Sequence, residues 1–511
     1  MESKLPNGWA DTNLGSVFTF IGGGTPDKKN KDYWNGSIPW ASVKDIKSTF
    51  LRNTQDSISE SGLKGSASNL AEKNDLIVIT RISPGESAIA TRQTAINQDL
   101  KVAKLHAGMT PVFAHYLFRS IKHSIREISS GTTVLGIRNT DLKEISFPLP
   151  PLNEQKRIVA KIEELFSEID TGVASFQQAR RQLGVYRQAL LKKAFTAELT
   201  ADWRKEHPDQ IEPAKQLLER IRQEREARYQ QQLDDWKTAV REWEAGGKEG
   251  KKHAKPKKPK KLDPIQEATI PGEWVAFPYG ELCSIVRNGL SAKPSGNNGY
   301  KIARISAVRP MFFDYADYRY LDCSSEHAES YALRTGDLIF TRYNGSRRYV
   351  GVCAKYVEKD IRLFPDKLIQ TRPDLPSLDS AYLELALNSG CSRAFIETKI
   401  RTTAGQSGVS GGDVKLTPVA ICSLPEQKEI VRRLEAQFEA IEQNEREIDA
   451  ALQRAEALRQ SILKKAFSGQ LVPQDPNDEP ASILLERIRA ERESAGSKRK
   501  SLKNNKKKAL K

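Results

Sequence analysis

The sequence predicts an α+β protein in which two globular domains are separated by an antiparallel pair of long coiled-coil helices, with an internal pseudo-two-fold repeat. Three observations support this fold class. Two blocks of sequence recur at one constant offset, heptad-spaced apolar residues run through the recurring region, and the segments before it mix buried-strand and short helical patterns. At 511 residues the chain is also too long to fold around a single core.

The repeat is clearest in two blocks. Residues 154–159 read Glu-Gln-Lys-Arg-Ile-Val, and residues 426–431 read Glu-Gln-Lys-Glu-Ile-Val. Residues 187–195, Arg-Gln-Ala-Leu-Leu-Lys-Lys-Ala-Phe, return at 459–467 as Arg-Gln-Ser-Ile-Leu-Lys-Lys-Ala-Phe, so that both blocks share an offset of 272 residues. Because one inserted residue would rotate every later side chain by about 100°, a repeat without gaps indicates one continuous helix in each copy.

Weaker matches extend the repeat in both directions. Residues 217–222 and 484–489 both read Leu-Leu-Glu-Arg-Ile-Arg. Three upstream segments also resemble later ones: 5–9 resembles 270–274, 75–81 resembles 337–342, and 130–133 resembles 404–407. The chain is therefore a duplicated unit, in which a divergent globular domain precedes a well-preserved helix. Such a pattern suggests one scaffold that carries two different specificities.

Apolar residues at alternating spacings of three and four predict a coiled-coil seam along both helices. The predicted seam positions are Ile158, Ile162, Leu165, Ile169, Phe176, Leu183 and Leu190 in the first helix, and Ile430, Leu434, Ile441, Ile448, Leu458 and Ile462 in the second. The polar residues Gln437 and Asn444 fall in the same predicted seam, where they are expected to weaken it and to fix its register.

The first helix, at 154–195, would span about 60 Å at 1.5 Å per residue. We expect the two helices to pair antiparallel within one chain, because the first helix then ends beside the second domain. Parallel pairing also fits the length of the linker, and the pattern would equally suit dimerisation with another chain or ordinary amphipathic packing.

The predicted organisation has six parts: a globular domain at 1–150, a helix at 151–200, a charged helical and Lys-rich linker at 201–264, a second globular domain at 265–423, a second helix at 424–472, and a helical segment with a basic tail at 473–511. Within the globular domains we expect buried strands at 75–80 and 337–341 and helices at 115–120 and 382–386. Trp9 and Trp274 are expected to mark the first strand of each domain.

The formal net charge of +16 comes almost entirely from two short segments. Residues 248–261 hold eight lysines and one glutamate, and residues 498–511 hold eight Lys or Arg and no acid, which leaves about +1 for the rest of the chain. Such segments attract polyanions without sequence preference, but a solvated linker and tail have the same composition. Charge alone therefore does not establish DNA binding.

The composition favours a cytoplasmic location. No run of about 18 apolar residues is present, and the N-terminus lacks the apolar core of a signal peptide. None of the five cysteines pairs at Cys-x-x-Cys spacing, which is typical of free thiols in a reducing compartment.

Motifs for catalysis are weak, and neither a catalytic residue nor a metal site is predicted. The Gly-rich run at 20–24 superficially fits the cofactor loop of amino-methyltransferases, but Pro26 follows where a helix should begin and the Pro-Pro-Tyr/Phe partner motif is missing. The sequence has no G-x-x-x-x-G-K-[ST] phosphate loop. Asp141 and Asp413 could end a nuclease motif, but neither has an upstream Pro-Asp at convincing spacing.

Polar and basic loops after strand ends are the candidates for contacts with DNA bases and phosphates. In the first domain these candidates are Thr25, Lys28, Lys29, Ser42, Lys44, Arg81, Gly131, Thr132 and Thr133. In the second domain they are Lys293, Arg342, Tyr343, Asn344, Ser346, Arg347, Arg348, Gln406 and Ser407. A solvated surface role is the alternative for each of them.

The repeated blocks resemble a known family. Residues 149–159, followed by 187–195, resemble the conserved region of the specificity subunit of type I restriction–modification systems. Residues 130–133, ahead of Asp141, resemble the close of its target-recognition domain. The resemblance covers about 1–200 and 265–472, and it departs where the usual double-proline approach to the second helix is reduced to Pro425.

This resemblance implies a non-catalytic subunit that binds double-stranded DNA. Each target-recognition domain would bind one half of a bipartite target, while the helices would set the spacing and dock two methyltransferase subunits. Restriction subunits that translocate DNA would join them, so that S-adenosylmethionine, ATP and magnesium are expected on the partners. The residues alone leave two alternatives: an enzyme with an unrecognised site, and a coiled-coil scaffold without sequence preference.

Overall fold

The computed structural model describes residues 5–106, 108–131, 134–248, 254–260, 263–265, 270, 272–294, 297–403 and 405–494. The chain divides into two compact units. The first combines residues 1–178 with 448–511, and the second holds residues 179–447. Both long helices cross this division, so each unit contains part of each helix.

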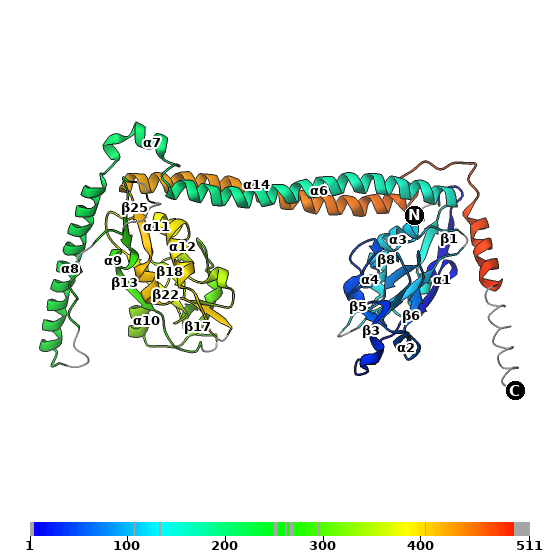
Figure 1. The fold of residues 1–511 in the computed structure, drawn as a ribbon, viewed down its shortest axis with the longest axis horizontal. Helices are drawn as coiled ribbons and strands as arrows, with labels where there is room; N and C mark the ends of the chain where they lie inside the picture. The colour runs from blue at the N-terminus through cyan, green and yellow to red at the C-terminus, as the bar shows by residue number, and fades with distance from the viewer. Residues whose placement is uncertain are drawn as a thin grey trace. The chain divides into compact units, whose positions relative to one another are not determined.

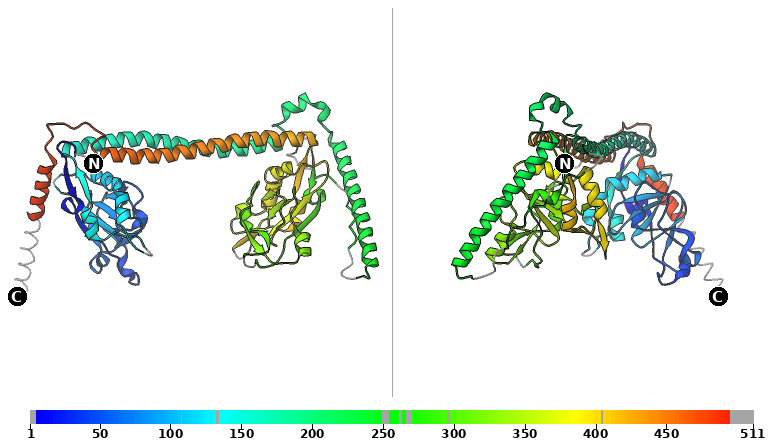
Figure 2. Two further views of the ribbon diagram at one scale, coloured as in Figure 1. Left: turned by 180° about the vertical axis from the view of Figure 1, so that it is seen from behind. Right: turned by 60° about the vertical axis from the view of Figure 1, so that its left-hand side comes forward.

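The two repeated blocks lie in helices α6, Leu152–Phe195, and α14, Leu424–Ala466, which run to 44 and 43 residues. The prediction of one continuous helix in each copy is therefore confirmed (Figure 1). The helices pack side by side and antiparallel within each unit (Figure 2). In the first unit Arg459 forms an ion pair with Asp170, and in the second the Tyr186 hydroxyl donates to Gln437 Oε1 at 3.1 Å.

The seam is only partly the predicted one. Eight of its residues are buried as expected: Ile158, Ile162, Leu190, Ile430, Leu434, Ile441, Ile448 and Ile462. Leu165, Ile169 and Leu183 are half-buried. Phe176 and Leu458, in contrast, are 38% and 50% exposed, so their assignment to the seam is wrong. Gln437 and Asn444 are exposed as well, although Gln437 still accepts the hydrogen bond from Tyr186 across the pair.

The seam alternates between two heptad series, and the error at Leu458 is a shift of one residue in one of them; Phe176 belongs to the other series, to which this shift does not apply. Phe166 and Ala466 are buried at the shifted position, and Phe438 packs against the core of the second unit. Two arginines share this position: Arg459 stacks on Phe166 at 5.8 Å in the first unit, and Arg187 stacks on Phe438 at 5.5 Å in the second. A count of apolar residues misses this register, because the hydrocarbon stem of arginine fills a seam position as well as an aliphatic side chain does.

Each unit holds a sheet-rich domain, and the two domains share the order of their central strands. The first has a strand pair β1–β11, a five-stranded sheet ordered β2-β10-β7-β8-β4, and a four-stranded sheet ordered β5-β3-β9-β6. The strand bounds are β1 Ala10–Asn13, β2 Thr19–Gly22, β3 Trp34–Ala41, β4 Phe50–Leu51, β5 Asp56–Ile58, β6 Asn69–Ala71, β7 Leu76–Ile79, β8 Ser87–Ala90, β9 Thr94–Ile96, β10 Leu100–Lys104 and β11 Ser146–Leu149.

The second domain repeats the strand pair as β12–β25 and the central strands as the sheets β13-β22-β18-β20 and β17-β14-β21. It also contains two small sheets, β15-β16 and β19-β24-β23. The strand bounds are β12 Val275–Pro278, β13 Cys283–Asn288, β14 Tyr300–Ala303, β15 Val308–Arg309, β16 Phe312–Phe313, β17 Tyr318–Leu321, β18 Leu338–Thr341, β19 Tyr343–Asn344, β20 Cys353–Lys355, β21 Arg362–Leu363, β22 Leu368–Pro373, β23 Arg401–Thr403, β24 Gln406–Gly408 and β25 Pro418–Ile421. The internal repeat thus extends to the strand order.

Shorter helices complete the two units. The predicted helices fall in α3 and α11, and the predicted strands are β7 and β18, all of whose residues are buried. The helix bounds are α1 Leu14–Val17, α2 Glu60–Lys64, α3 Pro111–Ser120, α4 Lys122–Ile128, α5 Asn139–Glu144, α7 Ala201–Glu206, α8 Ala214–Ala245, α9 Tyr279–Leu282, α10 Ser325–Tyr331, α11 Ser380–Leu387, α12 Gly390–Lys399 and α13 Gly411–Leu416. Among the described helices, none has the length and hydrophobicity to cross a bilayer.

The repeated Glu-Gln block has a structural explanation. Each of its glutamates is buried at the start of a long helix and accepts the indole N–H of the tryptophan before the first strand: Glu154 from Trp9 at 2.9 Å, and Glu426 from Trp274 at 3.3 Å. The neighbouring Gln155 donates to the carbonyl of Pro150 at 2.9 Å. These bonds fasten each long helix to its own domain.

Candidate nucleic-acid interface

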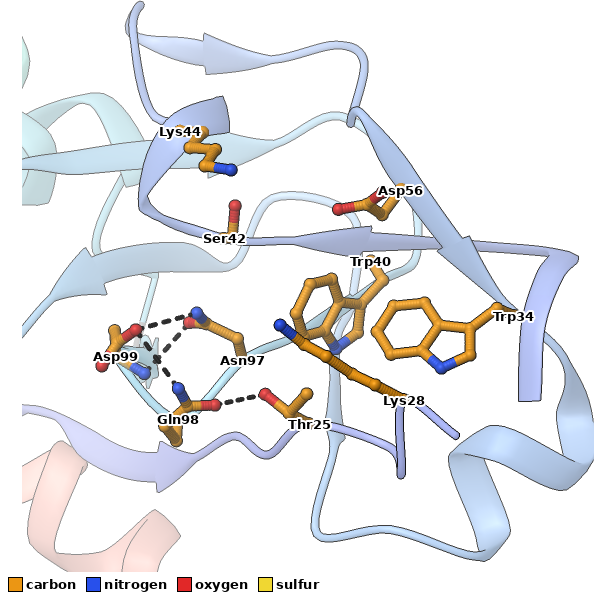
Figure 3. A pocket seen from close by; sticks show the side chains of 10 residues that line it. All are labelled: Thr25, Lys28, Trp34, Trp40, Ser42, Lys44, Asp56, Asn97, Gln98 and Asp99. Carbon is orange, nitrogen blue, oxygen red and sulfur yellow. Dashed lines mark hydrogen bonds between the residues drawn. The ribbon is translucent and has the colours of Figure 1, made fainter. Parts of the chain in front are cut away.

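A cavity of about 710 Å³ opens on the first domain (Figure 3). Four segments build it: the loop after β2, the end of β3 with the 3-10 turn Val43–Asp45, the start of β5, and the turn between β9 and β10. Its lining residues are Thr25, Lys28, Trp34, Trp40, Ser42, Lys44, Asp56, Asn97, Gln98 and Asp99. The side chains therefore offer two indoles, two amides, two ammonium groups and two carboxylates.

The Gly-rich run leads directly into the loop that lines this cavity from Thr25 onward. A Cβ on Gly23 would lie 2.3 Å from the carbonyl oxygens of Ile96 and Asn97, so only glycine lets this loop approach the end of β9. The Trp40 indole donates to the Gly24 carbonyl at 3.2 Å and meets the Trp34 ring edge-on at 5.2 Å. The glycines thus serve close packing of the loop, which is consistent with rejecting a cofactor loop.

The turn between β9 and β10 is held by its own side chains. The Asn97 amide donates to Asp99 Oδ2 at 3.0 Å, and the Thr25 hydroxyl bonds to Gln98 Oε1. Arg81, which follows β7, pairs with Asp99 Oδ1 at 3.1 Å. Because Gln98 is exposed at the apex of this braced turn, its amide is presented to solvent in a fixed position.

The second domain has a cavity of about 540 Å³ built on the corresponding strand ends and turns, with further side chains from β15, β19 and β24. The loops match through one shared bond: Gly24 N donates to the Ile96 carbonyl at 3.0 Å in the first domain, and Leu290 N donates to the Phe364 carbonyl at 2.9 Å in the second. The polar side chains that line the second cavity are Arg304, Ser306, Arg309, Arg319, Tyr343, Asn344, Asp366, Lys367 and Gln406.

Comparison with known proteins decides the family. The type I restriction modification DNA specificity domain matches residues 6–174. The specificity subunit of the type I restriction enzyme EcoKI, from Escherichia coli strain K12, is 30% identical over 532 aligned residues, covering 98% of this chain and 99% of that protein. The chain belongs to the specificity subunits of type I restriction–modification systems.

Further relatives agree with this assignment. The specificity subunit of the type I restriction enzyme StySPI, from Salmonella potsdam, is 26% identical and aligns with 98% of this chain and 99% of its own. A structure from work on complex assembly and conformational transition of the type I R-M system matches with a TM-score of 0.62 at 17% identity, covering 91% of this chain and 99% of that one. At that identity the match supports the fold alone. The predicted resemblance and the DNA-specificity role are confirmed.

Four predicted residues of the first target-recognition domain line its cavity together: Thr25, Lys28, Ser42 and Lys44. Arg81 joins them through its ion pair with Asp99. Gly131 directly follows Ser130, which forms an isolated β-bridge with Gly136. Gly136 forms a second isolated β-bridge with Arg81. Lys29 is exposed but does not line the cavity. Thr132 and Thr133 lie outside the described residues.

The second target-recognition domain brings fewer of its predicted residues together. Tyr343, Asn344 and Gln406 line the cavity, and Arg342 stacks on Tyr343 at 4.8 Å while donating to the Asp366 carbonyl at 3.1 Å. Ser346 and Lys293 are exposed outside the lining.

Three predicted residues of this domain are engaged elsewhere. Arg347 donates to the Glu397 carbonyl at 3.0 Å, near the end of α12, and Arg348 stacks on Tyr349 at 5.6 Å. Ser407 is buried, with its hydroxyl bonded to Thr402 at 2.9 Å. Ser407 is thus taken up in local packing, whereas Arg347 and Arg348 keep exposed side chains.

Sequence reasoning missed the basic residues of the second cavity: Arg304, Arg309, Arg319 and Lys367. Arg304 directly follows β14 and precedes a 3-10 turn, just as Ser42 directly follows β3. The internal repeat would have supplied this signal if the strand ends of the two domains had been aligned. Among the described residues Asp366 is the one carboxylate that lines the second cavity, which is strongly basic, whereas lysines and aspartates balance in the first.

The chemistry open to the titratable groups of the described residues depends on how they cluster and on how burial shifts their pKa values. Among the residues that the structure describes, no three His, Cys, Asp or Glu side chains come close enough together to hold a metal ion. Burial lowers the pKa of His115 to about 4, which leaves it neutral beside Ser87 at 3.0 Å. Burial likewise raises the pKa of the Cys283 thiol to about 12, so this thiol is a poor nucleophile.

Proposed function

We propose that this chain is the non-catalytic DNA-reading subunit of its complex, and that each target-recognition domain binds one half of a bipartite target through the cavity described above. One observation carries the proposal: two cavities share four corresponding strand ends and turns, to which the second adds β15, β19 and β24, and they differ in chemistry. One fold with two linings suits the reading of two different half-sites.

The lining residues match what DNA recognition requires. Lys28 and Lys44 are exposed ammonium groups at the first cavity, suited to phosphate oxygens. Gln98 in the first domain, and the basic groups in the second, can bond to base edges in the major groove.

The non-catalytic role is tested on the purified chain alone, which is expected neither to cleave nor to methylate DNA. Either activity would contradict the proposal.

The long helices act as the ruler between the half-sites. A helix of 44 residues is about 66 Å long at 1.5 Å per residue, and its pairing within one chain supports a fixed length. Helix pairing would thus set the number of unspecified base pairs, much as the separation of two reading heads does in dimeric DNA-binding proteins.

The ruler is tested by inserting one heptad into both α6 and α14. Seven residues preserve the seam and add about 10 Å, or roughly three base pairs of 3.4 Å. Methylome sequencing of cells that carry the variant should find unchanged half-sites and a longer spacer. A seven-residue insertion in the Lys-rich stretch 254–260 is the matched control and should leave the spacer alone. An unchanged spacer in the heptad variant would contradict the ruler.

We also propose that the long helices dock two methyltransferase subunits, with restriction subunits joining the complex. Apolar side chains outside the seam support this: Phe176, Val185, Tyr186 and Leu458 are 38%, 70%, 47% and 50% exposed. In the second unit Tyr186 also lines a largely apolar groove of about 510 Å³ together with Leu199 and Ala436. Exposed apolar residues on helices mark protein contacts. S-adenosylmethionine, ATP and magnesium would then be bound by the partners.

Docking is tested by replacing Val185 with glutamate. This side chain makes little contact within the chain, so the variant should fold but should bind the methyltransferase subunits at least about tenfold more weakly, since a charge would be buried at the contact. Gln182→Glu, one turn away on the same helix and also exposed, is the control. Equal recovery of methyltransferase subunits with both variants would contradict docking at this face.

A further inference from the structure

Arg304 is held in a defined position at the rim of the second cavity. It directly follows β14 and opens the 3-10 turn Ile305–Ala307. Its guanidinium Nη1 lies 3.0 Å from Asp317 Oδ1, and its backbone N–H donates to the Asp317 carbonyl at 3.1 Å. Asp317 thus holds both the backbone and the side chain of this arginine.

The two members of this pair differ in exposure. The side chain of Asp317 is 18% exposed and that of Arg304 is 49% exposed. The carboxylate therefore supports the arginine from the protein side and occupies one end of the guanidinium. Among the described residues no second partner takes up the remaining N–H groups of Arg304, which is one of the residues that line the cavity.

An oriented guanidinium fits one base in particular. Its parallel N–H donors match the O6 and N7 acceptors of guanine in the major groove, which is the commonest specific contact between a side chain and a base. A supporting carboxylate reduces the rotamer entropy that a free arginine would lose on binding. An arginine braced in this way is suited to reading a base, whereas a mobile cation is sufficient for a phosphate.

We propose that Arg304 determines specificity in the second target-recognition domain by reading a guanine, and that Asp317 is its positioning residue. This assignment rests on the proposed function, because it presumes that the cavity faces DNA. The neighbouring Arg319 and Lys367 are exposed and have no ion-pair partner among the described residues, so they suit phosphate contacts.

The first domain has no arginine held by a carboxylate at the equivalent position. Ser42 stands where Arg304 does, and its hydroxyl is bonded to Asp45 Oδ2 at 3.0 Å. Its short side chain presents no fork of donors. The guanine requirement of Arg304 should therefore be confined to one half-site and have no counterpart at the same place in the other.

The test uses the full complex with its methyltransferase subunits, with methylome sequencing as the readout. In the Arg304→Ala variant, preference for guanine at one position of one half-site should fall by about tenfold or more, with the other half-site unchanged. Asp317→Asn should reduce the same preference to a smaller extent, since the arginine remains but is held less firmly. Arg304→Lys keeps a cation but lacks the pair of parallel donors, so it should also reduce the preference for guanine at that position.

Each result separates the possibilities. Arg319→Ala, the control, should weaken methylation uniformly and leave the motif intact. If Arg304→Ala behaves like this control, Arg304 contacts a phosphate and guanine reading is wrong, while the proposed function stands. If the wild-type complex methylates no bipartite motif, the proposed function itself fails. If Arg304→Ala does not assemble with its partners, an unchanged motif in the Arg304→Lys and Asp317→Asn variants overturns the proposal.

Discussion

At the scale of single residues, the buried glutamates at the helix starts show how one sequence position serves both copies of the repeat. Glu154 accepts from Trp9 and, at 3.3 Å, from Gln474. Glu426 accepts from Trp274 and, at 2.7 Å, from Arg204. The tryptophan contact is common to both copies, while the second donor differs. A glutamate is favoured at this buried position because a buried indole N–H without an acceptor would lower the stability of the fold.

Glu154→Ala should therefore destabilise the first unit. The change leaves the Trp9 N–H buried without a partner, which should lower the free energy of unfolding by about 1–3 kcal/mol, measured by urea denaturation. Glu154→Gln keeps a carbonyl acceptor and should lose less. An equal loss in both variants would mean that the carboxylate, and not the acceptor, stabilises this contact.

Glu429 should make stability depend on pH. Hydrogen bonds from Arg432 and then Arg433 lower its pKa from 4.5 to about 2. A carboxyl whose pKa is depressed in the folded state contributes stability above its unfolded pKa and loses it as the pH falls through the folded one. The gap in unfolding free energy between the wild type and Glu429→Gln should therefore shrink between pH 4.5 and about 2. A gap that widens on acidification would contradict this coupling.

At the scale of elements, the long helices show which seam positions can be predicted from the spacing of apolar residues and which cannot. The heptad through Ile162 and Ile169, and its counterpart through Leu434 and Ile441, was predictable because those positions are aliphatic and lie in the seam. The alternate position was not, because Arg187 and Arg459 stand there and pair with aromatic rings. A scale that counts arginine as purely polar moves the seam by one residue.

Adjacent seam candidates provide a direct test of the corrected register. Ile462 is 6% exposed and Leu458 is 50% exposed, although both were predicted in the seam. Ile462→Ala should cost about 2–4 kcal/mol of unfolding free energy through the cavity it leaves, while Leu458→Ala should cost less than about 0.5 kcal/mol. Chemical denaturation of the two variants gives both values. Similar costs would restore the register predicted from the sequence.

The candidate interface was partly predictable for a comparable reason. Thr25, Lys28, Ser42 and Lys44 were found because polar and basic residues in loops near strand ends form an obvious group. Arg304 was missed because its bond to Asp317 joins residues 13 positions apart on different strand ends. Such pairings depend on strand register, which a single sequence does not reveal without comparing its two copies.

At the scale of the whole molecule, each compact unit is completed by a segment that follows a long helix. Leu217 and Ile221 of α8 are buried in the core of the second unit. Leu484 and Ile488, from the other copy of the same six-residue block, are buried in the core of the first unit. Arg225 pairs with Glu281 of α9, and Arg492 donates to the carbonyl of Gly15 in α1 at 2.7 Å. The repeat therefore includes these closing helices.

These closing helices should be essential to one unit each. Leu484→Asp with Ile488→Asp places two charges in the core of the first unit, where burying even one unpaired charge costs several kcal/mol. The first unit should then exchange its amide hydrogens rapidly, while the second keeps its protection. Leu217→Asp with Ile221→Asp should reverse this pattern. Ile483→Asp is the matched control, because this neighbour is 38% exposed and should be tolerated. If both double variants loosened both units equally, the two cores would form one cooperative structure, and the independence of the two reading domains would be lost.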